Sequence, residues 1–329
     1  MTHDPDVQRF GIRPHDEGMH PYPPDTPEWQ ESVFYDFIDE GGTLAGHCRL
    51  GLHPAHQTMW LWLFVTDGEG WLAIEQPQLP YRTFDTDHWS FTHEGLSFER
   101  QVSSPLHDNT LRVSGPATRI SGARAGASES VDLALTFTAA GPAYSMGERE
   151  ETGPDGAAYE AKRFEQPMAV RGSIQLGDRR YDFQGRGERD HSWGSRYWDF
   201  MDWTFMTLHG AALRAQCTEV CFGGSRFTLG YVQRDEMVAI HEATFDLSLR
   251  PDLDDPCSGT VQVPVPGGET LSGRVVAVGV VPIQISHVYA MPLEAMYRRA
   301  LIRWEPDDGS APCMGWLEWC VRLSEPADA

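Results

Sequence analysis

The residues from Gly185 to Asp199 read GRGERDHSWGSRYWD, a stretch unlike the rest of the chain. Three acids, three arginines, one histidine and two tryptophans lie within these 15 residues. A carboxylate beside large aromatic rings is typical of a site that donates a proton and shelters the resulting cation. The same composition also fits a strand end that is fixed by salt bridges. The stretch therefore indicates either a reactive site or a structural ion-pair cluster.

On both sides of this stretch the chain reads as short strands separated by turns. Residues 173–176 and 179–183 flank Gly177-Asp178, which predicts a tight hairpin. Further hairpins are predicted from the paired runs 229–232 with 237–240, 261–265 with 273–281, and 300–304 with 315–323. The apolar run 57–65 predicts a strand buried on both faces. Because no βαβ alternation appears, we expect an all-β chain of antiparallel barrels or sandwiches.

Turn-rich segments divide the chain. Residues 141–162 carry two Gly-Pro pairs and a charged cluster, and they predict a linker with a domain boundary near residue 165. We therefore expect an irregular N-terminal arm over 1–30, a β domain over 31–165 and a second β domain over 166–329. Residues 293–296 predict a short helical turn before a strand.

Composition restricts the partners. The formal net charge of −22 over 329 residues disfavours nucleic acid and anionic membranes. No apolar run approaches the roughly 18 residues of a membrane helix, so no membrane insertion is expected. Six cysteines without metal-type spacing indicate reduced thiols in a cytoplasmic protein. The oligomeric state is left open by the sequence, and a homodimer is compatible with it.

The motif Arg189-Asp190-His191-Ser192-Trp193-Gly194 resembles the Asp-His-Asn-Trp-Gly signature of carotenoid 1,2-hydratases, also called hydroxyneurosporene synthases. The runs 45–51, 60–64 and 164–167 are similar to the wider group, which includes AttH-like proteins and certain fungal Diels–Alderases. The resemblance implies two lipocalin-like (calycin) antiparallel β-barrel or sandwich domains packed together, with few short helices. It says less about the reaction, because one fold hosts unrelated chemistries.

The same resemblance implies that Asp190 protonates an alkene, after which water adds. Arg189 directly before this acid and Ser192 in place of asparagine depart from the signature. A neighbouring guanidinium would lower the pKa of Asp190, which suits a base better than an acid. His191 is the candidate proton shuttle. In an extended strand, however, Asp190 and His191 point to opposite faces and do not form one dyad.

Candidate substrate-binding residues surround this pair. Trp193 and Trp198 would form an apolar wall, and Arg196 would bind a polar or anionic substituent. The remaining candidates are Tyr197, Asp202, Trp60 and Trp62. For each a structural role is the alternative: a salt bridge from Asp190 to Arg189 or Arg196, a backbone-bonded His191, and core positions for the strand tryptophans.

The sequence predicts neither a metal nor a cofactor. His53 and His56 lack a third ligand, and His15, Asp16, Glu17 and His20 lie in the predicted arm. No phosphate-binding or dinucleotide motif occurs. We therefore predict a cofactor-independent lyase or hydratase that applies acid–base chemistry to a hydrophobic terpenoid, polyketide, steroid-like or aromatic molecule. Two alternatives are a non-catalytic lipocalin-like carrier and an isomerase or cyclase acting on a polyene.

Overall fold

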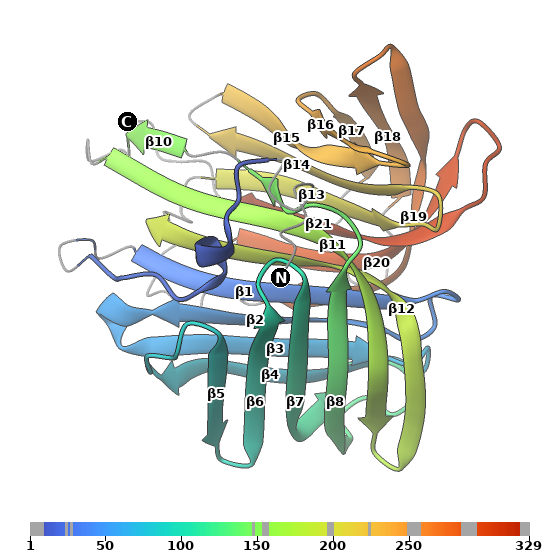
Figure 1. Cartoon of the computed structure of the whole chain (residues 1–329). Coiled ribbons are helices and arrows are strands. Elements are labelled where there is room, and N and C mark those ends of the chain that lie inside the picture. Colours follow the sequence, from blue (N-terminus) through green and yellow to red (C-terminus); the bar gives the residue numbers. More distant parts are fainter. Residues whose placement is uncertain are drawn as a thin grey trace. The chain divides into compact units, whose positions relative to one another are not determined.

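A computed structural model describes residues 10–23, 26, 29–146, 149–152, 158–195, 201–222, 225–248, 258–283 and 295–322. Almost all regular structure in these residues is antiparallel strand (Figure 1), and the helices are the short 3₁₀ segments η2 (Pro14–Glu17) and η3 (Pro54–His56). The all-β prediction is confirmed. No helix among the described residues has the length and apolarity that a membrane crossing requires.

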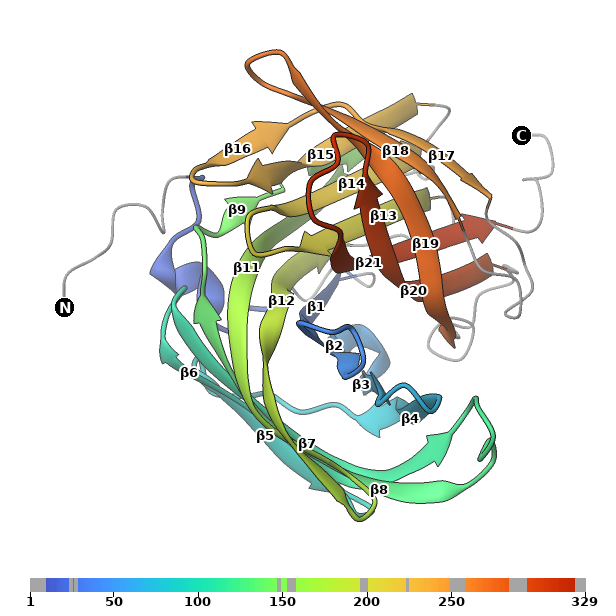
Figure 2. The same ribbon diagram turned by 90° about the vertical axis from the view of Figure 1, so that its right-hand side faces the viewer.

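The chain divides into two compact units, Met1–Arg196 and Tyr197–Ala329. The strands of the N-terminal unit are β1 (Trp29–Asp39), β2 (Ala45–His53), β3 (Thr58–Thr66), β4 (Trp71–Pro80), β5 (His88–His93), β6 (Leu96–Ser104), β7 (Asp108–Arg119), β8 (Ser128–Ala139), β9 (Tyr144–Ser145), β10 (Arg149–Thr152), β11 (Ala158–Leu176) and β12 (Arg179–Ser195). The pairs β4–β7, β7–β8, β8–β11, β11–β12 and β12–β1, followed by β1 to β4 in order, close a ring. The strong curvature of β7, β8, β11 and β12 is visible in Figure 2.

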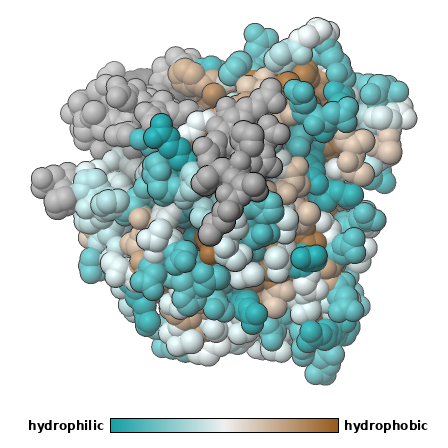
Figure 3. Space-filling view, viewed as in Figure 1, coloured by the Kyte–Doolittle hydropathy of each residue, from teal (hydrophilic) through white to brown (hydrophobic). Residues whose placement is uncertain are grey.

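Along β7 and β8, which form one wall of this ring, buried and more exposed residues alternate with a two-residue period. Leu111 and Val113 of β7 and Leu133 and Leu135 of β8 point into the core, whereas their neighbours are exposed or half-buried. Mainly hydrophilic and neutral residues cover the corresponding lower part of Figure 3, over β5 to β8. This alternation is what a sheet shows when one face contacts the core and the other contacts water.

The opposite wall is buried on both faces. In β3, Leu61 and Leu63 enter the core, and the alternating Trp60 and Trp62 are buried on the other face. The predicted doubly buried strand at 57–65 is therefore confirmed. β1 and β2 and the second half of β12 are buried in the same way, and their second face carries polar side chains.

The C-terminal unit contains β13 (Met201–His209), β14 (Arg214–Phe222), β15 (Ser225–Gln233), β16 (Met237–Ile240), β17 (Thr244–Ser248), β18 (Ser258–Val265), β19 (Glu269–Ile283), β20 (Ala295–Pro306) and β21 (Cys313–Arg322). The strand order of its described sheet is β16-β15-β14-β13-β21-β20-β19-β18-β17. The predicted hairpins correspond to β11–β12, β15–β16, β18–β19 and β20–β21. A core that includes Trp304 and Trp319 lies against this sheet.

Three sequence expectations differ from the structure. Within the predicted linker, β9 and β10 pair with β11, so these parts of the segment belong to the sheet of the N-terminal unit. The boundary expected near residue 165 falls inside β11, and the two units divide at 196/197. Of the predicted helical turn at 293–296, Ala295 and Met296 belong to β20, and 293–294 lie outside the described residues.

The close approach of β12 to β1 at Gly187 predicts that a larger side chain there would destabilise the protein. A methyl group there would overlap the backbone carbonyl oxygen of Asp36 on β1, so the two strands would have to separate. We expect Gly187→Ala to lower the free energy of unfolding by about 1–3 kcal/mol, the usual cost of overpacking. Urea denaturation measures this change. At Gly41 a methyl group would meet only ordinary contacts, so Gly41→Ala should change stability by less than about 1 kcal/mol. Equal effects of the two substitutions would contradict the steric argument.

Candidate functional site

The conspicuous motif lies in the extended strand β12, which places its alternate residues on opposite faces. Trp193 belongs to an interior cluster with Trp29 and Phe164. Asp190 instead contacts Arg163, which alternates with Phe164 on β11. His191 lies on the interior face, where its ring meets Trp193 and Phe164. Asp190 and His191 therefore belong to two separate side-chain clusters.

The outward cluster contains two carboxylates and one guanidinium. Glu165 of β11 stands opposite Asp190 of β12 in the strand register. Arg163 Nη2 lies 2.5 Å from Glu165 Oε1 and 2.9 Å from Asp190 Oδ2. The side chain of Glu165 is fully buried, and that of Asp190 is 8% exposed. Asp190 pairs with Arg163 and not with Arg189, and the alternative partner Arg196 lies outside the described residues.

Burial controls the protonation of Glu165. Loss of hydration raises its pKa, and the negative charge of Asp190 raises it further against the opposing effect of Arg163, to about 8. Arg163 donates its hydrogen bond to Oε1, whereas Oε2 has no hydrogen-bond partner among the described residues. The raised pKa therefore favours the protonated form of Glu165 at neutral pH, and Oε2 is the oxygen left to carry the proton.

A pocket of about 320 Å³ has Arg163 of this cluster in its wall, whereas Glu165 and Asp190 are not among its described lining residues. Arg163 and Trp193 lie in its wall together with Gly11, Ile12, Arg13, His15, Asp16, Ser145 and Lys162. Its volume is at the lower end of the range for small-molecule sites. The lining is more polar than the apolar chamber that the sequence suggested, and most of its charged groups are cationic.

On the interior face of β12, Arg189 belongs to an ion-pair network around Glu17 of the N-terminal arm. Arg189 donates from Nη1 to Glu17 Oε1 at 2.5 Å and from Nη2 to Oε2 at 2.8 Å. Arg100 of β6 donates from Nη2 to Oε1 at 2.5 Å. Burial alone would raise the pKa of Glu17, but the attraction of Arg189 and then of Arg100 outweighs it and lowers the pKa to about 2. The arm is thus anchored inside the unit by a buried ion-pair network.

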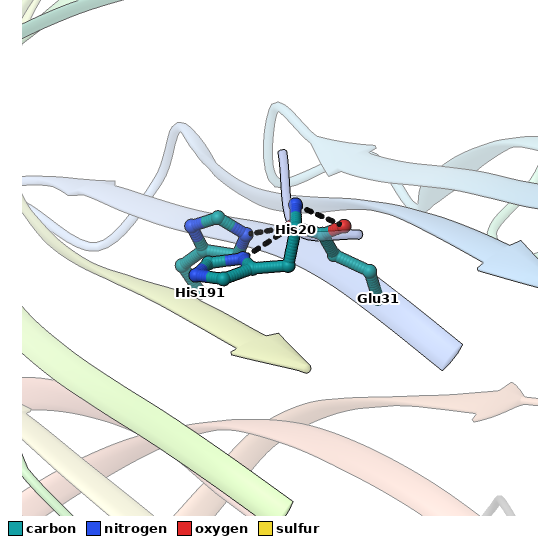
Figure 4. A group of neighbouring side chains, drawn as sticks. All are labelled: His20, Glu31 and His191. Atoms are coloured by element: carbon teal, nitrogen blue, oxygen red, sulfur yellow. Dashed lines mark hydrogen bonds and ion pairs between the residues drawn. The ribbon is translucent and has the colours of Figure 1, made fainter. Parts of the chain in front are cut away.

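A second interior group consists of His20, Glu31 and His191 (Figure 4). Glu31 Oε1 lies 2.9 Å from His20 Nδ1 and 2.8 Å from His191 Nε2. Burial raises the pKa of Glu31, but the hydrogen bonds from His191 and His20 outweigh it and leave the pKa below its usual value. Burial lowers the pKa of His191 despite the partly opposing effect of Glu31, so this imidazole is neutral at pH 7.

The other predicted site residues lie elsewhere. Trp60 and Trp62 meet edge to face at 4.4 Å on the outward face of β3, and the Arg49 guanidinium lies 5.3 and 5.1 Å from their rings. Asp202 is half-buried in β13 of the C-terminal unit. The predicted positions Arg196, Tyr197 and Trp198 lie outside the described residues.

Sequence reasoning missed several members of these clusters. Glu17 and His20 were assigned to an irregular arm, and Glu31 and Arg100 were not singled out. The sequence analysis includes Glu165 only within the run 164–167. A signal was present nonetheless, because an acid next to Phe164 in a buried strand is expensive to bury without a role.

The chain belongs to the family described as a domain of unknown function, DUF7064, whose model matches residues 13–322. No curated protein matches the chain.

Solved structures show the same fold. An AttH-like protein (NE1406) from Nitrosomonas europaea is similar with a TM-score of 0.64 and 13% identity, over 96% of this chain and 98% of that one. Kievitone hydratase from Nectria haematococca has a TM-score of 0.56 and 9% identity, over 97% and 95%. CghA has a TM-score of 0.51 and 12% identity, over 98% and 97%. The predicted lipocalin-like fold, shared with an AttH-like protein and with a hydratase, is thus confirmed.

The Glu17 network predicts that neutralising the Glu17 carboxylate destabilises the protein, whereas neutralising an exposed carboxylate does not. Glu17→Gln leaves Arg100 and Arg189 buried beside a neutral amide, so we expect a loss of about 3–5 kcal/mol in the free energy of unfolding. Glu40→Gln should have no measurable effect, since Glu40 is 73% exposed in its pair with Arg186. Chemical denaturation at pH 7 compares the two variants.

The same network predicts a pH dependence of stability. The folded pKa of Glu17, about 2, lies below its ordinary value of 4.5, so its contribution is complete above pH 4.5 and is lost as pH falls toward 2. Between these pH values the stability difference between wild type and Glu17→Gln should therefore shrink. A difference that stays constant down to pH 2 would rule out an ionised Glu17 as its cause.

Proposed function

We propose that this member of the DUF7064 family is a hydratase- or lyase-type enzyme that exchanges protons between the Glu165–Asp190 pair and a small organic substrate. The observation that supports it best is a single guanidinium, that of Arg163, in contact with two buried carboxyl groups on adjacent strands. Acid–base catalysis requires one group that holds a proton and one that accepts it. Glu165, whose pKa is raised to about 8, is the group proposed to hold the proton, and the adjacent Asp190 is the group proposed to accept one.

The two groups take different parts in the proposed reaction. Glu165 donates the proton on Oε2 to one carbon of a double bond, and the electron pair of that bond forms the new C–H bond. Water attacks the cationic carbon and gives its surplus proton to Asp190, whose charge Arg163 neutralises before the reaction. Transfer of that proton back to Glu165 restores the pair, and the reverse sequence eliminates water. The step needs carboxyl groups and water, so the proposal includes no cofactor.

The pocket beside Arg163 defines the proposed substrate class. Ile12 and Trp193 offer apolar contacts, and Arg13, Lys162 and Arg163 favour a polar or anionic substituent. We therefore propose a terpenoid, polyketide, steroid-like or aromatic molecule that carries an oxygen function. The fold likeness to kievitone hydratase supports a hydratase-type reaction. We propose a cytoplasmic location, since six cysteines without metal-type spacing indicate reduced thiols.

Solvent deuterium tests the assignment of Asp190. Ligands that co-purify with the protein, identified by native mass spectrometry, are incubated with it in D₂O. We expect wild type to add D₂O to one of them or to exchange deuterium into it. Asp190→Asn should slow this reaction about 10²–10⁴-fold, the usual contribution of a positioned acid or base.

The matched control is Asp132→Asn, at an exposed position of β8, which should react at the wild-type rate. A wild-type rate in Asp190→Asn would refute the proposed role. A ligand that binds wild type without any exchange would favour a carrier, and an isomeric product without deuterium would favour a cyclase.

The protonation of Glu165 predicts the alkaline limb of the pH profile. Because its pKa is raised to about 8, the acid form persists at pH 7 and is lost as pH rises through 8. The value of kcat/KM should therefore fall above about pH 8. Glu165→Gln should leave a small residual activity without this limb, since glutamine has no acidic proton in that range. A wild-type profile that stays level to pH 9.5 would exclude Glu165 as the acid.

A further inference from the structure

We propose that His20, Glu31 and His191 form a binding site for a divalent cation of the Zn²⁺ type inside the N-terminal unit. Figure 4 shows the three side chains converging from the arm, β1 and β12. Their ligand atoms all lie within 4.8 Å of one another, and no other described residues form such a group. Glu165 and Asp190 take no part in it, so this inference is independent of the proposed reaction.

The donor set matches the chemistry of zinc. Two imidazole nitrogens and one carboxylate oxygen are the ligands of many catalytic zinc sites, which keep a fourth position open. Ligand atoms about 2.0–2.1 Å from a tetrahedral ion lie roughly 3.3 Å apart. Glu31 Oε1 lies 2.9 Å from His20 Nδ1 and 2.8 Å from His191 Nε2, so each of these distances must open by roughly 0.4–0.5 Å to admit the ion.

The ring proton of His191 can move to its other nitrogen without loss of another hydrogen bond. In the metal-free cluster each imidazole donates an N–H to Glu31. Metal binding requires both of these nitrogens as lone pairs, so each ring must carry its proton on the other nitrogen. His191 Nδ1 has no hydrogen-bond partner among the described residues, so this atom can take the proton without breaking a contact. No net proton has to leave the site.

Aromatic rings hold the two imidazoles in place. His20 stacks on Trp193 with ring centroids 3.9 Å apart and an interplanar angle of 8°. The rings of Trp89 and Phe164 each lie 5.9 Å from that of His191. The side chains of Glu31 and His191 are fully buried, and burial strengthens the attraction between a cation and the Glu31 carboxylate.

Nearby positive charge limits the affinity. Arg100 acts electrostatically on His191, and Glu17 is paired with both Arg100 and Arg189. Glu17 thus offsets part of the charge that opposes a cation. The site therefore depends on the arm twice, through the ligand His20 and through the compensating Glu17.

Calorimetric titration of chelator-treated full-length protein with ZnCl₂ tests the proposal. We expect one saturable site in wild type and a loss of affinity of at least about 100-fold in His20→Ala, since loss of an outer-shell partner alone costs 10–100-fold. His15→Ala, at a 72% exposed histidine of the same arm, should bind like wild type. Circular dichroism checks that each variant is folded.

Cobalt substitution provides a readout that needs no variant. Co²⁺ bound to wild type by two imidazoles and a carboxylate should show the intense visible absorption of a four- or five-coordinate ion, and Zn²⁺ should displace it. Absence of saturable binding, an octahedral Co²⁺ spectrum, or equal affinity in His20→Ala and wild type would overturn the proposal.

Discussion

The two-residue period of β12 is the constraint on which the arrangement of both clusters depends. Adjacent residues of an extended strand point to opposite faces of a sheet. Asp190 therefore joins Arg163 and Glu165, while His191 joins Glu31 and His20. Because the second half of β12 is buried on both faces, each cluster lies in surroundings where charge is costly unless it is paired. One strand thus supports two chemically distinct groups that share no side chain.

The Glu17 network and the cluster of Glu165, Asp190 and Arg163 compensate the cost of burying charge in different ways. Glu17 stays ionised because two guanidinium groups surround it, and their attraction exceeds the loss of hydration. Glu165 shares a single guanidinium with Asp190, so one positive charge faces two acids and Glu165 keeps its proton. Burial is the largest influence on the pKa of both carboxyls, and the number of guanidinium groups that face each one then separates a structural anchor from a group that is poised to donate a proton.

Much of the fold followed from local sequence patterns. Hairpins such as Gly177-Asp178 between β11 and β12 are encoded by adjacent residues, and the doubly buried β3 is encoded by its continuous apolar run. The opposite orientations of Asp190 and His191 followed from strand geometry alone. The contacts of the clusters did not, since they join residues far apart in the chain. Arg189 meets Glu17 across 172 positions, and no periodicity in a polar, proline-rich arm shows that it enters a core.

The N-terminal arm connects the two clusters physically. Gly11, Ile12, Arg13, His15 and Asp16 line the pocket beside Arg163, and His20 reaches Glu31 in the interior. Trp193 stacks on His20 and also lies in the pocket wall. A cation held by His20 would fix the arm and the indole together and would thereby order the wall against which a substrate packs. Ordering the arm in advance lowers the entropy cost of binding, so cation binding and substrate binding would favour each other without any shared ligand.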